Sequence, residues 1–209
     1  MTAVPPFLPI APGVTYAPGF LSRADQERLR DAVFEILAGA PPFQPRMPRT
    51  GRPFSVRMSN CGPLGWVSDE TGYRYQATHP ESGRPWPPMP ALLKEVWARL
   101  APDAPAPEAC LINLYEPKAR MGLHQDRDEA DRSAPVVSLS LGASALFRLG
   151  GLKRTDPTRS LRLESGDALA FGGENRLAFH GVDRIYPGST LLPGGGRINL
   201  TLRRVTNAA

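Results

Sequence analysis

Cysteine is scarce in this chain: its 209 residues include only Cys61 and Cys110, which lie far apart and show no metal-binding spacing. This scarcity excludes a small disulfide-stapled scaffold and a cysteine-rich structural zinc site. A chain of this length can bury a hydrophobic core without such staples. The two cysteines are therefore interpreted as buried free thiols, and we expect a protein of the reducing cytoplasm.

Long apolar runs and targeting signals are also missing. No stretch is long enough to cross a bilayer, so we expect no membrane association. Residues 1–12 are apolar but carry no basic segment of the kind that begins a secretory signal. No internal repeat or low-complexity linker interrupts the chain. The sequence thus predicts a single domain over residues 1–209, and nothing in it demands more than a monomer.

Proline and glycine are abundant, with 24 and 20 residues, and this favours a loop-rich β architecture over a helical bundle. Ser22 followed by Asp25 is typical of a helix start, and Gly39 ends the helix that follows. A second helix is predicted over residues 91–100. Residues 41–60 have no clean period and are rich in Pro, Gly and Arg, so we expect an irregular, mobile segment there.

From residue 109 onward the pattern changes to short strands. Apolar and polar residues alternate in the clearest of them, and Gly and Asp separate the rest. The predicted strands cover residues 109–115, 136–141, 145–149, 160–163, 168–171, 178–182 and 197–203. Many short strands after two helices predict an α+β fold that is mostly β. We expect a sandwich or jelly roll with the N-terminal helices packed on one sheet.

Basic residues exceed acidic ones, with 25 Lys and Arg against 20 Asp and Glu, which gives a formal net charge of +5. A basic balance permits nucleic-acid binding without proving it. The arginines gather in two loop-like stretches, residues 46–57 and 148–162. Arginines on loops, unlike those on one basic helix, indicate contacts to phosphates from the rim of a site.

Histidine is almost as rare as cysteine, with three residues. His124 and Asp126 are separated by one residue, which places both side chains on the same face of an extended chain. His180 follows much later, at what is interpreted as the end of a strand. Two imidazoles and one carboxylate bind one face of an octahedral ion such as non-haem Fe(II) and leave other positions open. The alternative is a surface His–Asp hydrogen bond without a metal.

The last predicted strand has an unusual polar face, which carries Arg197, Asn199, Thr201 and Arg203. Its two arginines lie roughly 20 Å apart along an extended strand, yet their long side chains could converge on a small dianion. Arginine is the side chain best suited to bidentate carboxylate binding. The alternative is an ordinary strand face in contact with solvent.

Six segments carry a resemblance to a known family. They are Leu-Ile-Asn-Leu-Tyr (111–115), Leu-His-Gln-Asp-Arg-Asp (123–128), Val-Ser-Leu-Ser-Leu-Gly (137–142), Gly-Gly-Leu-Lys-Arg (150–154), Phe-His-Gly (179–181) and Arg-Ile-Asn-Leu-Thr-Leu-Arg (197–203). In this order and spacing they resemble the AlkB family of Fe(II)- and 2-oxoglutarate-dependent dioxygenases, which repair alkylated nucleic acids. Residues 60–66 and 85–87 resemble its bacterial branch. The similarity implies a double-stranded β-helix (jelly roll) core over residues 109–205, an N-terminal extension and helix (1–45) and a nucleotide-recognition lid (46–90).

The resemblance also implies a role for individual residues. It assigns Fe(II) binding and catalysis to His124, Asp126 and His180. It assigns 2-oxoglutarate binding to Arg197 at the distal carboxylate, to Arg203 near the carboxylate beside the keto group, and to Asn113, Tyr115 and Asn199. It assigns contacts with the alkylated base to Trp66, Tyr73, Asp128 and Arg154, and places Met58 in the lid. The cosubstrates would be 2-oxoglutarate and O2.

The implied reaction is oxidative dealkylation of 1-methyladenine and 3-methylcytosine in DNA, which releases the alkyl group as an aldehyde. Because an alkylated base is cationic, Trp66 could attract it through its ring and Asp128 through its charge. A base must leave the duplex to reach a buried metal, so single-stranded DNA or a flipped base is the expected partner. Fold alone does not exclude an RNA or tRNA demethylase or hydroxylase, or a non-catalytic nucleic-acid-binding module.

Overall fold

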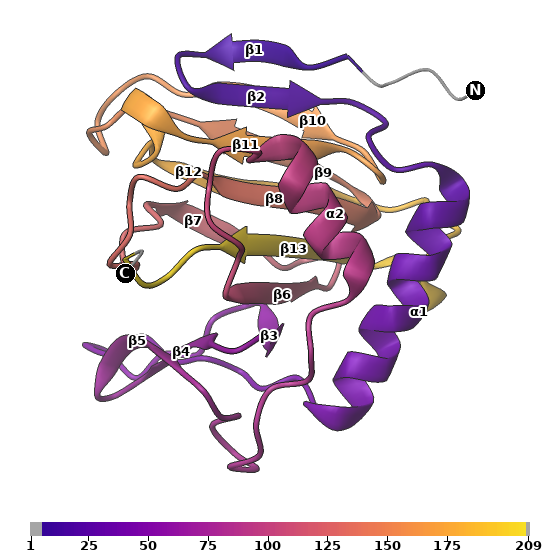
Figure 1. Ribbon diagram of the computed structural model, residues 1–209, viewed down its shortest axis with the longest axis vertical. Helices are drawn as coiled ribbons and strands as arrows, with labels where there is room; N and C mark the ends of the chain where they lie inside the picture. The colour runs from indigo at the N-terminus through magenta and orange to yellow at the C-terminus, as the bar shows by residue number, and fades with distance from the viewer. Residues whose placement is uncertain (1–5, 208–209) are drawn as a thin grey trace.

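Two antiparallel sheets face each other, and two helices cover the outer side of the larger sheet (Figure 1). The computed structural model describes residues 6–207. The larger sheet has seven strands in the order β1-β2-β11-β8-β13-β6-β3. These strands are β1 (Leu8–Ala11), β2 (Val14–Ala17), β11 (Ala168–Phe171), β8 (Val136–Gly142), β13 (Arg197–Arg203), β6 (Ala109–Tyr115) and β3 (Arg57–Cys61).

The smaller sheet has four strands in the order β10-β9-β12-β7. These are β10 (Arg159–Leu163), β9 (Ser144–Leu149), β12 (His180–Tyr186) and β7 (Met121–His124). Val136 of the larger sheet and Phe147 of the smaller one belong to a single hydrophobic cluster between the two sheets. A separate hairpin of β4 (Gly65–Asp69) and β5 (Gly72–Gln76) lies beside β3 and below β6 in Figure 1. The facing sheets confirm the predicted, mostly β jelly roll.

Helix α1 (Arg23–Gly39) begins where the capping pattern predicts. The Ser22 hydroxyl accepts a hydrogen bond from the backbone N–H of Asp25 at 3.1 Å, which satisfies one of the free donors at the helix start. Leu29, Val33 and Ile36 recur at helical spacing on one face and are buried. That face packs on the outer side of the larger sheet.

Helix α2 (Ala91–Leu100) matches its predicted range and buries Leu93, Val96 and Trp97. Figure 1 shows it crossing the outer face of the larger sheet. Both helices belong to one hydrophobic cluster with the apolar side of β13, including Leu200 and Leu202, which are fully buried. The helices therefore close the outer face of the sheet, and its inner face is left for the site.

Strand β13 is an interior strand of the larger sheet, between β6 and β8. Its Arg197 and Arg203 are only 2% and 5% exposed, so the solvated-face alternative for this strand is excluded. Because side chains alternate along a strand, Leu200 faces the helices while the two arginines face the space between the sheets. A buried charge needs a partner or a ligand, and β13 carries two such charges.

The N-terminal half contains more strands than the sequence predicts. Residues 57–61, which overlap the end of the segment 41–60 expected to be irregular, form β3 and pair with β6 at the edge of the larger sheet. Strands β1 and β2 were also not predicted, and they add to the opposite edge through β11. These short strands are held by pairing with a neighbour, and they lack a long alternating pattern of their own. His180 begins β12 instead of ending a strand.

No helix among residues 6–207 is long and apolar enough to cross a membrane.

The packing of β13 against the helices predicts a large stability loss for Leu200→Ala. Leu200 is fully buried, so the cavity left behind should lower the free energy of unfolding by about 2–5 kcal/mol. Leu152→Ala is the matched control, because Leu152 is 52% exposed and should change stability by about 0.5 kcal/mol or less. Urea unfolding followed by circular dichroism measures both. Equal losses would mean that β13 is not a packed core strand.

Candidate metal centre and its cavity

The two histidines of interest lie opposite each other on neighbouring strands. His124 ends β7, His180 begins β12, and the two are direct partners in the antiparallel register. The next residue on β12 is Gly181, where an added Cβ would stand 2.5 Å from the Met121 carbonyl oxygen. Glycine therefore permits the close approach of β12 to β7 that brings both imidazoles to one place.

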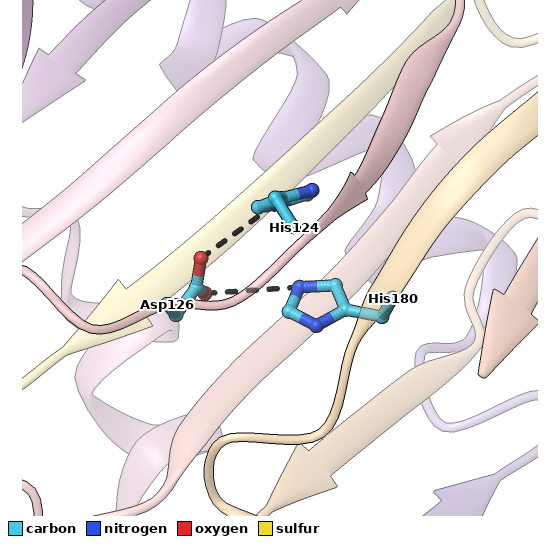
Figure 2. A group of neighbouring side chains, drawn as sticks. All are labelled: His124, Asp126 and His180. Atoms are coloured by element: carbon cyan, nitrogen blue, oxygen red, sulfur yellow. Dashed lines mark ion pairs between the residues drawn. The ribbon is translucent and has the colours of Figure 1, made fainter. Parts of the chain in front are cut away.

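The third member of the group is Asp126, two residues beyond the end of β7. Figure 2 shows its carboxylate between the two imidazoles. Oδ1 lies 3.6 Å from Nε2 of His124, and Oδ2 lies 3.9 Å from Nε2 of His180. One ligand atom from each of the three residues falls within 4.8 Å of the others. The structure thus brings together the three residues that the sequence indicated.

Hydrogen bonds orient both rings. Nδ1 of His124 lies 2.9 Å from the Gly122 carbonyl, and Nδ1 of His180 lies 2.9 Å from the Ala178 carbonyl. A carbonyl can only accept, so each Nδ1 carries a proton, and in the neutral form of each ring Nε2 holds the lone pair that a metal requires. This is the arrangement by which carbonyl groups orient metal-binding histidines.

The charge states also suit a divalent cation. Burial, with a contribution from His124, lowers the pKa of His180 to about 4, so this ring is neutral at neutral pH. Burial opposes ionisation of Asp126, but the Arg203 guanidinium and the two histidines together outweigh it and hold the pKa of this carboxyl well below its usual range. A neutral imidazole and an ionised carboxylate are the forms that bind metal.

Arg203 supports the carboxylate of Asp126 directly. Its Nε and Nη2 donate to Oδ2 at 3.2 and 2.8 Å, and Nε also lies 3.3 Å from Oε1 of Glu129. The ion pairs with Asp126 and Glu129 raise the pKa of Arg203 despite its burial. Oδ1 of Asp126, by contrast, faces His124. The arginine therefore occupies one carboxylate oxygen and leaves the other directed at the metal position.

Arg197 lies at the other end of the same strand face and is much less satisfied. Its Nη2 donates to the Ser140 hydroxyl at 2.9 Å, and its strand partner is Tyr115. Burial lowers the pKa of Arg197 to about 10, so it remains a cation at neutral pH. Burial also raises the pKa of Tyr115 to about 12, so its hydroxyl stays protonated. Together they present hydrogen-bond donors to the space between the sheets.

A cavity of about 890 Å³ joins these groups to solvent. Every site residue implied by the sequence lies on its wall: Met58, Trp66, Tyr73, Asn113, Tyr115, His124, Asp126, Asp128, Arg154, His180, Arg197, Asn199 and Arg203. Met58, which the resemblance places in the lid, is a 1% exposed residue of β3 whose strand partner is Asn113. It faces the cavity from the edge of the larger sheet.

An aromatic pair and a carboxylate line one part of this wall. The Trp66 indole N–H donates to Oδ2 of Asp128 at 2.9 Å. The Trp66 ring also stacks on Tyr73, with centroids 5.6 Å apart and planes 19° apart. Tyr73 is 49% exposed, so the pair reaches from the cavity towards solvent. From another part of the wall, the Arg154 guanidinium packs over the Phe179 ring at 5.0 Å.

Comparison with known proteins identifies the family. A model of the 2OG-Fe(II) oxygenase superfamily matches residues 13–203. The chain is 56% identical to an "alpha-ketoglutarate-dependent dioxygenase AlkB homolog" of Caulobacter vibrioides over 96% of this chain and 91% of that one. It is 42% identical to the Escherichia coli dioxygenase AlkB over 94% and 92% of the two chains. The chain belongs to the AlkB family.

More distant matches agree with the fold. The solved structure of OsALKBH1 superimposes with a TM-score of 0.80 at 31% identity, over 95% of this chain and 100% of that one. A "DNA N(6)-methyladenine demethylase ALKBH1C" of Arabidopsis thaliana is 31% identical over 93% of this chain and 49% of its own length. The chain is therefore an Fe(II)- and 2-oxoglutarate-dependent dioxygenase with a jelly-roll core, as the resemblance implied.

The residues of this AlkB family member fit both cofactors. Nε and Nη1 of Arg197, Nη1 of Arg203 and Oδ1 of Asn113 are buried without a hydrogen-bond partner among residues 6–207. Buried polar atoms are rarely left unpaired in a folded protein, because each lost hydrogen bond costs free energy. Three free cationic donors on one strand face match the oxygens of a dicarboxylate such as 2-oxoglutarate. The group of two histidines and one aspartate matches Fe(II).

Sequence reasoning missed several residues of the site. Phe171 stacks on His180 with centroids 5.0 Å apart, and its position at the end of a predicted strand was the only signal for it. Glu129 and Arg176, which form a buried ion pair at 3.1 Å, had no signal because both lie outside the strands. The third histidine, His79, does not line the cavity. Its Nε2 lies 2.8 Å from the Pro41 carbonyl oxygen, and it is a structural core residue.

The ion pair between Asp126 and Arg203 predicts that Asp126→Ala destabilises the metal-free protein. Removing one partner of a buried pair costs about 3–5 kcal/mol, and we expect about 3 kcal/mol here because Glu129 still reaches Arg203. His124→Ala is the matched control: its side chain is 39% exposed, and we expect a loss of about 1 kcal/mol or less. Urea unfolding in the presence of a chelator measures both, and losses of equal size would contradict the role of the ion pair.

Proposed function

We propose that this dioxygenase removes alkyl groups from N-alkylated bases of DNA, with 1-methyladenine and 3-methylcytosine as substrates, and so reverses alkylation damage directly. The observation that carries the proposal is the Trp66–Asp128 pair on the wall of the cavity that also holds the two histidines and Asp126. An aromatic face next to a carboxylate suits a flat cation, and a base alkylated at a ring nitrogen is such a cation. The name of the Arabidopsis relative, a DNA N(6)-methyladenine demethylase, supports DNA as the polymer that is demethylated.

In this proposal His124, Asp126 and His180 hold the Fe(II) ion. Bound there, Fe(II) with 2-oxoglutarate and O2 supplies the oxidation of the alkyl carbon, coupled to decarboxylation of the keto acid. The carbonyl contacts place the proton of each neutral ring on Nδ1, so that Nε2 has a lone pair for the metal. Arg203 keeps Asp126 ionised and fixed. These groups are set before any ligand arrives, so little reorganisation is needed during the reaction.

Arg197 is the proposed partner of the distal carboxylate of 2-oxoglutarate, because its Nε and Nη1 have no partner among residues 6–207. Tyr115 and Asn113 would add hydrogen bonds from β6, and Asn199 would lie between the two arginines on β13. The remaining free nitrogen of Arg203, Nη1, is the proposed donor to the carboxylate beside the keto group. A bidentate pairing of guanidinium with carboxylate is strong and directional, and so it orients the cosubstrate.

The substrate side of the cavity is proposed to include Trp66, Tyr73, Asp128, Arg154 and Met58. Stacking of a base on an aromatic ring is worth about 1–3 kcal/mol. Tyr73 already covers one face of Trp66, so the incoming base would stack on the other face, with Asp128 beside it. Hairpin β4–β5, in the proposed recognition segment 46–90, carries both aromatic residues. Arg154, which lines the same cavity, is the remaining proposed contact of the base, and the base would enter from single-stranded DNA or by flipping.

Mass spectrometry of a single-stranded DNA oligonucleotide with one 3-methylcytosine tests the function. Incubation with the protein, Fe(II), 2-oxoglutarate and air should remove one methyl mass, and His124→Ala should abolish the loss because it removes an iron ligand. A methylated RNA of the same sequence runs in parallel. If the methyl group is lost faster from the RNA, RNA is the preferred substrate and the DNA assignment is wrong. If succinate forms without a mass change in either polymer, the nucleic-acid proposal is overturned.

Substitutions at the two ends of the cavity should each raise the KM for a different substrate. Arg197→Ala should raise the KM for 2-oxoglutarate by about 10-fold or more, since a charge-assisted hydrogen bond contributes about 1.5–3 kcal/mol, and it should leave the KM for the oligonucleotide nearly unchanged. Trp66→Ala should raise the KM for the oligonucleotide by about 5- to 100-fold, from the value of one stacked base, and spare 2-oxoglutarate. Steady-state kinetics with each substrate varied in turn would contradict the division if either variant changed both constants alike.

A further inference from the structure

Arg176 joins the two halves of the metal centre although it touches none of the three candidate ligand side chains. It is 4% exposed and lies four residues before His180, directly after the short turn η1 (Gly173–Asn175). Its guanidinium has three acceptors. Nη1 donates to the Asp126 carbonyl at 2.7 Å, Nε donates to the Ala134 carbonyl at 2.8 Å, and Nη2 pairs with Glu129 at 3.1 Å. All three acceptors belong to the loop between β7 and β8.

Glu129 completes the connection from inside the same loop. It is 3% exposed, and its Oε2 faces Arg176 while Oε1 accepts a hydrogen bond from the Tyr75 hydroxyl and lies 3.3 Å from Nε of Arg203. Arg203 in turn bonds to the carboxylate of Asp126. Both the backbone and the side chain of Asp126 are thus held by buried arginines, and Glu129 lies between the two.

The loop needs such support because no strand holds it. Residues 125–135 follow β7 without a regular element, so the backbone of Asp126 has no ladder of hydrogen bonds to fix it. A free loop of this length would spread Asp126 over many positions, and ordering it costs conformational entropy. A buried ion pair is by itself weak evidence for stability, because the desolvation of both charges offsets their attraction. Its position between the ligand segments points to another role.

We propose that Arg176, with Glu129 as its partner, is a positioning residue that sets the spacing of Asp126 and His180 before the metal binds. The inference rests on the proposed iron ligands and adds a residue that contacts neither metal nor substrate. Because Arg176 reaches the Asp126 carbonyl from a segment that continues into His180, it fixes one ligand relative to the other. Groups that orient metal ligands in this way typically contribute about 10- to 100-fold to metal affinity.

The test is a titration of the metal-free protein with Co(II), followed by visible absorption in the absence of oxygen. Arg176→Lys keeps the charge that faces Glu129, but an ammonium group cannot reach three acceptors in the fork geometry of a guanidinium. We expect its dissociation constant for Co(II) to rise about 10- to 100-fold. Arg204→Lys is the matched control, because Arg204 also pairs with a glutamate, Glu108, and with backbone carbonyls, but on the outside of the cavity. Its Co(II) affinity should equal that of the wild type.

A second variant guards against loss of the fold. Arg176→Met combined with Glu129→Gln removes both charges, so no unpaired charge is buried, while the side-chain volumes stay similar. Circular dichroism of the metal-free proteins establishes that each variant is folded at the temperature of the titration. A folded double variant should show the same loss of Co(II) affinity, because the bonds to the Asp126 and Ala134 carbonyls are gone. Wild-type affinity in a folded Arg176→Lys or in the double variant would overturn the inference.

His124→Ala separates the failure of this inference from the failure of the proposed ligand set. If His124→Ala binds Co(II) as tightly as the wild type, the three residues do not form the metal site. The positioning role of Arg176 is then wrong as well. If His124→Ala weakens binding while the folded Arg176 variants do not, the ligand set stands and only the role of Arg176 is lost. Weak binding in His124→Ala and in both Arg176 variants, with normal binding in Arg204→Lys, supports both.

Discussion

The ion pair between Asp126 and Arg203 is the interaction on which the rest of the site depends. Both side chains are buried, so each lowers the free-energy cost of burying the other's charge, and Arg203 has Glu129 as a second acidic partner. The pair keeps Asp126 ionised when no cation is present and ties an irregular loop to β13, an interior strand of the larger sheet. The candidate ligands come from the smaller sheet and this loop, and the pair fixes the loop ligand relative to the larger sheet.

Strand β13 provides a fixed reference because it is paired on both sides, with β6 and with β8. Its alternation places Leu200 against the helices and both arginines in the cavity, so packing and chemistry are fixed by the same register. A shift of one residue would bury the arginines beneath the helices and expose the leucines to the cavity, and no partner could compensate for either. Arg197 and Arg203 therefore lie on the same face of β13. The same strand thus positions the proposed cosubstrate site and the arginine that supports Asp126.

Helices, strands and ligand spacings that depend on neighbouring residues could be predicted from the sequence. Elements and contacts that depend on residues far apart in the chain could not. The helix that Ser22 caps, the alternation of β13 and the spacing of His124 and Asp126 are all readable within a few residues. Strand β3 exists because β6 offers it an edge, and its Pro- and Arg-rich surroundings concealed it. Arg176 shows the same limit within the site: its importance comes from acceptors that lie about 40 to 50 residues earlier in the chain, which no local pattern encodes.

Tyr75 extends the buried network to hairpin β4–β5. Burial raises the pKa of Tyr75 well above its ordinary value, so the hydroxyl remains a donor to Glu129, which also contacts Arg176 and Arg203. The hairpin that carries Trp66 and Tyr73 is thus attached through one acid to the strand and the loop that hold Asp126. The hairpin cannot move independently of the sheet without breaking the buried hydrogen bond from Tyr75 to Glu129, which lies next to the charges of Arg176 and Arg203. In the proposed function, the surface that receives the base and the centre that oxidises it are therefore held in one rigid frame, and Glu129 is the point where they join.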